Sequence, residues 1–193
     1  MKLLIVLGAI TLFLAFSLVG SSTLSAALVS DIPVESKEQP TKEVILGSDS
    51  KSPKWKEVPF DHVTHSVKNY SRDGKSVIAC VECHHTDEPE AEAKKNPLHK
   101  TGQRDQILTT EVLAKADAKP VLSCRACHAQ KGEKPARWPA NPVVNIDGND
   151  VTEDNEKAYH RNCIDCHKDV KANRPDTIKN APTACGACHK TAS

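Results

Sequence analysis

The chain has 193 residues, with 26 Lys and Arg against 25 Asp and Glu, and a formal net charge of +1. This balance gives no reason to expect nucleic acid as a partner. Only three Phe, two Tyr and two Trp are present, so a conventional apolar core would be poorly supplied. Eight Cys and nine His indicate that a cofactor fills the interior instead, and we expect a mostly irregular fold with short α-helices and little β-structure.

Residues 1–27 have the features of an export signal. Lys2 provides a positive start, an uncharged run follows, and Ser25-Ala26-Ala27 has the small-x-small pattern of a signal peptidase site. The uncharged run continues to Val29 and is long enough to be an uncleaved membrane anchor instead. Both alternatives predict that the rest of the chain lies in the periplasm, either free or anchored to the inner membrane.

Residues 28–56 are predicted to form a flexible tether, because prolines interrupt a polar stretch of mixed charge. Val44–Leu46 is the one apolar patch in it and could form a short strand. Residues 57–193 hold every cysteine and every histidine, and we expect them to form a single cofactor-binding domain.

Four segments of this domain carry local signals. Asp87–Lys95 is acidic and then basic, which is typical of a solvated loop, and Lys131–Gly148 contains three prolines and is also predicted to be a loop. Arg104–Ala118 could form a weak helix. Thr152–Lys168 is the best helix candidate, with Thr152 as its cap and acidic residues in its first turn.

The cysteines form four pairs, each followed directly by histidine. The motifs are Cys80-Val-Glu-Cys83-His84, Cys124-Arg-Ala-Cys127-His128, Cys163-Ile-Asp-Cys166-His167 and Cys185-Gly-Ala-Cys188-His189. Cys-x-x-Cys-His is the haem c attachment motif: two thiols reach the vinyl groups of one porphyrin and the next imidazole binds its iron. Redox dithiols, zinc sites and disulfide frameworks also use paired cysteines, but none requires the histidine. We therefore expect four covalently attached haems c.

Each iron needs a second axial ligand, for which cytochromes commonly use His or Met. The single methionine is Met1, so histidine is predicted. Outside the motifs five histidines remain, one more than four haems need: His62, His65, His85, His99 and His160. We expect His62, His65, His85 and His160 to bind iron. His99 stands in a polar context and is expected to bind none, although it could replace His85.

Three pairs of histidines are too close along the chain to bind one iron from opposite faces: His84 with His85, His62 with His65, and His160 with His167. The first pair is adjacent, and the second lies on one helical face. The third is separated by two turns, about 10.5 Å, on one face of the same helix. The members of each pair must then serve different haems, which predicts a compact cluster linked by shared segments.

The order of motifs and histidines over residues 54–190 resembles class III cytochromes c of the tetrahaem cytochrome c3 type. The stretch between His85 and Cys124 is longer than in the small soluble members. The resemblance implies a small haem-packed fold for residues 57–193. It also implies four ligand pairs: His62 with His84, His85 with His128, His65 with His167, and His160 with His189.

Two histidine ligands favour a low reduction potential and leave no open position on the iron. The chain is therefore expected to be an electron carrier and not an enzyme. The resemblance implies partners such as a periplasmic hydrogenase, a formate dehydrogenase or a membrane redox complex in an anaerobic bacterium. Two alternatives stay open: a subunit of a haem wire or polymer, which needs a head-to-tail interface, and a multihaem reductase, which needs a five-coordinate iron.

Overall fold

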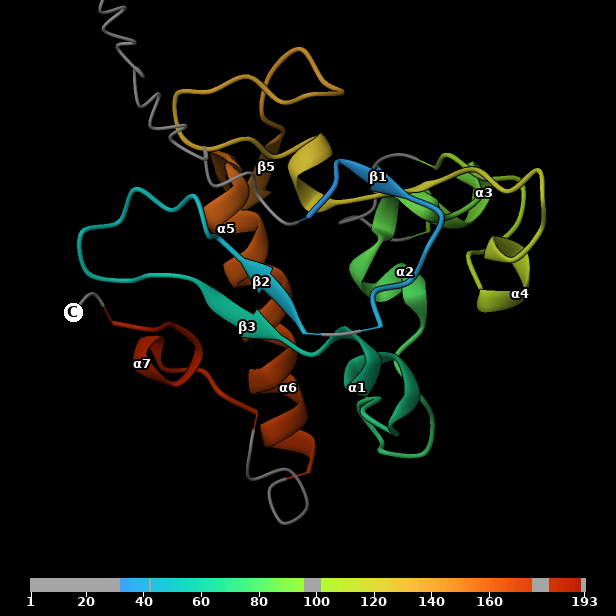
Figure 1. The fold of residues 1–193 in the computed structure, drawn as a ribbon, viewed down its shortest axis with the longest axis horizontal. Helices are drawn as coiled ribbons and strands as arrows, with labels where there is room; N and C mark the ends of the chain where they lie inside the picture. The colour runs from blue at the N-terminus through green and yellow to red at the C-terminus, as the bar shows by residue number, and fades with distance from the viewer. Residues whose placement is uncertain (1–31, 42, 96–101, 175–180, 192–193) are drawn as a thin grey trace, which may run out of the picture.

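The structure is a computed structural model, and it describes residues 32–41, 43–95, 102–174 and 181–191. The predicted export segment and His99 lie outside the described residues. Figure 1 shows short helices and two-stranded sheets joined by long connections, arranged around one longer helix in the middle of the view. Within the described ranges, no helix is long and apolar enough to cross a membrane.

Three antiparallel two-stranded sheets connect distant parts of the chain. They pair β1 (Glu35–Ser36) with β4 (Val121–Leu122), β2 (Val44–Leu46) with β3 (Val58–Phe60), and β5 (Val143–Ile146) with β6 (Asn149–Thr152). The strand expected at Val44–Leu46 is thus present. Both β1 and β2 come from the predicted tether and pair with strands of the predicted cofactor domain, so the packed part of the chain begins before residue 57.

The hairpin of β5 and β6 overlaps a segment that the sequence predicts to be a loop, Lys131–Gly148. That prediction is wrong from Val143 onward. Asp147 and Gly148 have φ angles of 51° and 84°, as the two central residues of a type I′ turn require, and Asp-Gly is a favoured pair for this turn. The prolines before the hairpin obscured a turn signal that was present.

The helices are short, and most of them lie beside a cysteine motif or a predicted ligand. They are α1 (His62–Val67), α2 (Cys80–Cys83), α3 (Glu90–Ala93), α4 (Thr110–Leu113), α5 (Asn155–His160), α6 (Cys166–Asn173) and α7 (Cys185–Cys188), with 3₁₀ turns at His85–Asp87 and Cys124–Ala126. Asp61 caps α1 by accepting a hydrogen bond from the backbone N–H of Thr64 at 2.8 Å. The helix expected over Arg104–Ala118 is reduced to α4, one turn that Thr109 caps.

The longer helix comprises α5, a π-helical turn over Arg161–Asp165, and α6. It is the helix expected at Thr152–Lys168, but it begins later because Thr152 ends β6 and Asp154 is the cap, accepting from the N–H of Lys157 at 3.1 Å. A π turn holds more residues per turn than an α-helix. Regular α-helix geometry predicted that His160 and His167, seven residues apart, lie on one helical face. The π turn between them changes this, so they do not share a face.

The segment Asp87–Lys95 is wholly or partly exposed along Glu90–Lys95 apart from the buried Ala93, but the prediction of a solvated loop is wrong at its start, where Asp87 and Glu88 are buried. Asp87 is 1% exposed and accepts a hydrogen bond from Nε of Arg104 at 2.9 Å. The same guanidinium donates through Nη2 to the carbonyl oxygens of Lys119 at 2.7 Å and Pro120 at 3.1 Å. Burial raises the pKa of Asp87 above its ordinary value. A buried ion pair thus ties the turn after the first motif to the chain leading into β4.

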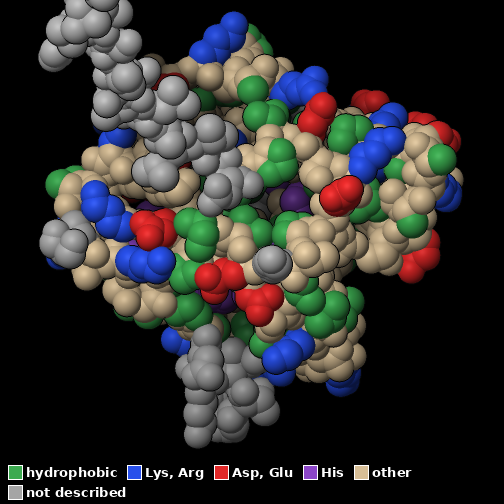
Figure 2. All heavy atoms as spheres, viewed as in Figure 1, with side chains coloured by type: hydrophobic (Ala, Val, Ile, Leu, Met, Phe, Trp, Pro, Cys, Tyr) green, Lys and Arg blue, Asp and Glu red, His purple; other side chains and the backbone are tan. Residues whose placement is uncertain are grey.

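Few large apolar side chains are buried. Among the described residues the buried apolar set is Val81, Ala93, Leu108, Ala118, Ala126, Cys127, Ala129, Val170 and Ala181. Figure 2 shows apolar side chains scattered over the visible face, with histidines visible only in gaps between other atoms. The interior is instead hollowed by a cavity of about 2900 Å³. This confirms a mostly irregular fold without a conventional apolar core.

Candidate haem sites

The motif cysteines and the predicted histidine ligands line one continuous cavity of about 2900 Å³. An ordinary small-molecule pocket measures about 300–1,000 Å³, so this space fits several cofactors and not one. The lining includes all eight motif cysteines and the histidines at positions 62, 65, 84, 85, 128, 160, 167 and 189. Residues that lie up to 127 positions apart in the sequence thus face a common interior.

The four motif histidines are held by backbone carbonyl groups. Nδ1 lies 3.3 Å from Leu122 O in His84, 2.7 Å from Glu153 O in His128, 2.6 Å from Pro182 O in His167 and 2.6 Å from Lys56 O in His189. A carbonyl oxygen can only accept, so Nδ1 carries the hydrogen and Nε2 keeps its lone pair. This is the tautomer that binds a metal through Nε2, with the other ring nitrogen fixed by a second group.

Three of the predicted ligand pairs are ring neighbours. The ring centres are 6.4 Å apart in His62 and His84, 6.4 Å in His65 and His167, and 6.0 Å in His160 and His189. A metal–imidazole bond measures about 2 Å, and the ring centre lies about 1.2 Å beyond the bonded nitrogen. Two imidazoles on opposite sides of one metal therefore have ring centres about 6.4 Å apart. The three separations therefore fit one iron between each pair of rings.

The environment of the first pair suits metal binding in a second way. Burial lowers the pKa of both His62 and His84, which favours the neutral imidazole that a metal requires.

On α1, Nδ1 of His65 donates to the carbonyl oxygen of Asp61 at 2.8 Å. His65 therefore has the same tautomer as the motif histidines, with the lone pair on Nε2.

The fourth predicted pair, His85 and His128, lines the same cavity as the other three pairs. His85 lies in the turn directly after the first motif and has contacts of its own, whereas His99 lies outside the described residues. The pairing of His85 with His128, and its replacement by His99, both stay predictions.

The sequence profile of the Class III cytochrome C family matches residues 36–144. The chain belongs to this family. The matched region includes the first two Cys-x-x-Cys-His motifs, and the third and fourth lie beyond it. Class III cytochromes c are electron carriers that hold haem c covalently, so the matched region is a multihaem electron-carrier domain.

A search of curated proteins finds a similar protein, the high-molecular-weight cytochrome c of Nitratidesulfovibrio vulgaris, at 29% identity over 139 residues. The alignment covers 70% of this class III cytochrome c and 18% of that protein, so the chain spans less than a fifth of the relative's length. No solved structure matches significantly.

The thiols of this class III cytochrome c do not have the properties of a redox dithiol. Cys83, Cys124 and Cys163 come from three motifs and lie close enough to interact electrostatically. Burial raises the pKa of Cys124 to about 12 and that of Cys163 to about 11. Reactive dithiols need a lowered thiol pKa, so these cysteines fit covalent attachment to a cofactor better than thiol chemistry.

Aromatic side chains near the ligands were not predicted from the sequence. The ring of Phe60, at the end of β3, lies 4.7 Å from that of His65 and 6.2 Å from that of His62, and Trp55 lies 6.1 Å from His189. The pairing of β3 with β2 therefore positions a ring against both predicted ligands of α1. Val58 and Phe60 favour a strand, but Pro59 between them does not, so the local sequence offered only a weak signal for this contact.

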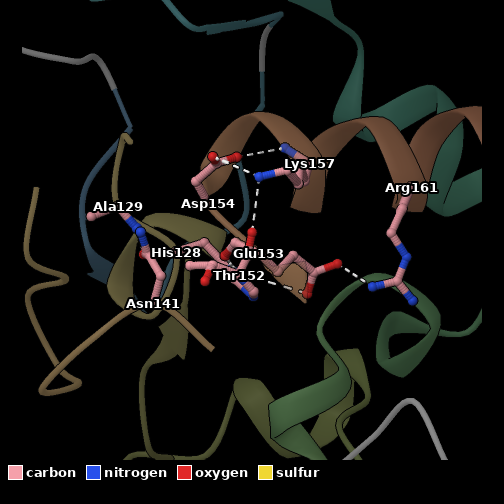
Figure 3. Close-up of polar contacts among 8 residues, drawn as sticks. All are labelled: His128, Ala129, Asn141, Thr152, Glu153, Asp154, Lys157 and Arg161. Carbon is pink, nitrogen blue, oxygen red and sulfur yellow. Dashed lines mark hydrogen bonds and ion pairs between the residues drawn. The ribbon is translucent and has the colours of Figure 1, made fainter. Parts of the chain in front are cut away.

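A polar network around the second motif was also missed. Figure 3 shows Glu153 next to His128, with its carboxylate directed to Arg161. The N–H of Ala129 donates to Asn141 Oδ1 at 2.6 Å, and the N–H of Glu153 donates to Pro142 O at 2.8 Å. Residues 13 and more positions after the motif thus fix it in place, and no local spacing pattern could have identified them.

Proposed function

We propose that the chain is a periplasmic, low-potential electron shuttle with four c-type haems. Each haem is bound by one Cys-x-x-Cys-His motif and ligated by two histidines. The separations of 6.0–6.4 Å in three pairs of imidazole rings are the observation that supports this most strongly. Class III cytochromes c are typically periplasmic, in keeping with the export segment predicted at residues 1–27, and residues 57–193 would hold the haems.

In the proposed assignment each motif histidine has one distal partner. The pairs are His84 with His62, His128 with His85, His167 with His65, and His189 with His160, and His99 is the alternative to His85. Short elements then connect neighbouring haems. Helix α1 carries ligands of the first and third haems, and the helix α5–α6 carries ligands of the third and fourth.

The protein residues hold the haems in fixed positions. The cysteine sulfurs anchor each porphyrin, and the backbone carbonyls keep each motif imidazole in one orientation. When bound, a haem iron gains or loses one electron without exchanging a ligand. Two imidazoles on each iron favour a low potential and leave no position for a substrate. Partners in this proposal are a hydrogenase, a formate dehydrogenase or a membrane cytochrome complex.

The number of haems can be counted directly. Intact mass spectrometry together with a pyridine haemochrome assay should give four haems per chain. The double substitution Cys185→Ser/Cys188→Ser should remove one haem, whereas Thr183→Ala, a control two residues before the motif, should retain four. A count below four in the unaltered protein would contradict the proposal.

The distal ligand of the second haem can be identified with carbon monoxide. Removing the true ligand opens a position on that iron, so the reduced variant binds carbon monoxide while the unaltered protein does not. We expect this from His85→Ala and not from His99→Ala. The opposite result would assign His99 to the second haem, and binding by neither variant would show that both assignments are wrong.

A further inference from the structure

The second motif has a buried carboxylate beside its histidine. Oε2 of Glu153 lies 3.9 Å from Nδ1 of His128, and the two side chains are only 10% and 6% exposed. In the described ranges no carboxylate lies within ion-pair distance of His84, His167 or His189. At the first motif the buried Asp87 also acts electrostatically on His84, but from beyond ion-pair distance. Among the described residues, the second motif therefore differs in how closely a carboxylate approaches its histidine.

Glu153 contacts His128 through both its backbone and its side chain. Its carbonyl oxygen accepts the hydrogen bond from Nδ1 at 2.7 Å, while its carboxylate pairs through Oε1 with Arg161. Figure 3 shows the glutamate between the histidine and the arginine. The arginine lies on the far side of the carboxylate and is 29% exposed. The negative charge is thus closer to the imidazole than the positive charge is, and better shielded from water.

This arrangement should affect the iron that His128 binds. A carboxylate near the outer nitrogen of a ligating imidazole increases electron donation to the metal. A negative charge in a poorly solvated site also favours the oxidised iron, which carries one more positive charge than the reduced iron. We propose that Glu153, acting through His128, lowers the reduction potential of the second haem, and that Arg161 limits the effect. This rests on the proposed haem at the second motif.

Removing the charge of Glu153 and removing that of Arg161 should shift the reduction potential of the second haem in opposite directions. Glu153→Gln keeps the backbone carbonyl and the side-chain shape but removes the negative charge and leaves Arg161 unpaired. The second haem should then be easier to reduce. We expect its ratio of reduced to oxidised form to rise about tenfold at a fixed solution potential, which equals 59 mV for one electron. Arg161→Gln leaves the carboxylate unopposed and should shift this ratio in the opposite direction.

Two further variants serve as controls. Arg161→Lys keeps the positive charge and should leave the potential close to that of the unaltered protein. The double variant Glu153→Gln/Arg161→Gln removes both charges without leaving either one unpaired, so it should fold even if one single variant does not. Its shift should be positive and smaller than that of Glu153→Gln alone.

The four potentials can be resolved by exchange NMR during a redox titration, with the second haem identified by contacts between its thioether substituents and the protons of Cys124 and Cys127. Shifts of equal sign in both single variants, no shift, or a shift at another haem would overturn the inference. Mass analysis of the peptide with Cys124 separates the two proposals. A peptide without haem contradicts the proposed function, whereas a peptide with haem and an unchanged potential contradicts only the role of Glu153.

Discussion

At the scale of single residues, the histidines are oriented mainly by backbone oxygens. The acceptors are the carbonyls of Leu122, Glu153, Pro182, Lys56 and Asp61. Every residue type has a carbonyl, so the identity of these side chains carries no signal of this role. The sequence could therefore predict which histidines are candidate ligands, but not the groups that hold them in place.

Substitution of the two proposed ligands on α1 tests the assignment of single residues. His62 and His65 are three positions apart but are assigned to different haems. Methionine as an axial ligand raises the potential, so His62→Met and His65→Met should each raise the potential of a different haem. The shift should be a fraction of the roughly 0.8 V that axial ligands span. Potentiometric titration followed by visible spectra checks this, and shifts of the same haem in both variants would show that the assignment is wrong.

The buried ion pair between Arg104 and Asp87 makes a prediction about stability. The side chains are 4% and 2% exposed, and breaking a buried pair by removing one partner costs about 3–5 kcal/mol. Arg104→Met should lower the free energy of unfolding of the haem-loaded protein by this amount in denaturant titrations.

Lys51 offers a matched control, because it forms an exposed pair with Glu133 in which the side chains are 75% and 48% exposed. Lys51→Met should cost less than about 1 kcal/mol. Equal effects of the two substitutions would mean that the buried pair contributes nothing beyond a surface contact.

At the scale of elements, the sequence was most informative where a periodic pattern was long. The helix after Thr152 was predicted in place, but it starts later, contains a π turn and continues past Lys168 to Asn173. The sheets β1–β4 and β5–β6 were missed because strands of two to four residues leave almost no period to detect. The local sequence around Arg104 predicted a helix. Its ion pair with Asp87 could not be predicted, because the two residues are 17 positions apart in the sequence.

The N-terminal strands test whether residues before 57 act as a tether or as part of the fold. Strand β1 pairs with β4, whose Leu122 carbonyl holds His84. Removing residues 32–46 should therefore lower the free energy of unfolding by on the order of 2 kcal/mol, since each backbone hydrogen bond contributes about 1 kcal/mol. It should also alter the spectrum of the first haem.

A shorter deletion that stops before Ile32 keeps both strands and serves as the control. Thermal unfolding and EPR spectra of the two truncated proteins can be compared directly. Identical stability and spectra would support a tether that does not contact the haem domain.

At the scale of the whole molecule, a large cavity takes the place of an apolar core, and the proposed haems would fill it. The buried apolar residues in the described part of the chain are mostly alanines, while one cavity of about 2900 Å³ occupies the interior. So few and such small buried apolar side chains cannot offset the conformational entropy that a domain of more than 100 residues loses on folding. Composition could predict this lack of a core, because aromatic residues are few, but not the positions of the connections around the haems.

The chain without haem should therefore be unfolded. A variant with serine at all eight motif cysteines should show no cooperative thermal transition by far-ultraviolet circular dichroism, whereas the haem-loaded protein should show one. A cooperative transition in the variant would mean that the polypeptide has a sufficient core of its own.

The central proposal is a cluster of four haems with two histidines on each iron. Low-temperature EPR of the oxidised protein tests both parts at once, because the integrated spins count the irons and the type of signal reports their ligands. We predict four low-spin ferric centres per chain and no high-spin signal. Fewer than four low-spin centres, or a high-spin signal from an iron with an open position, would contradict the proposal.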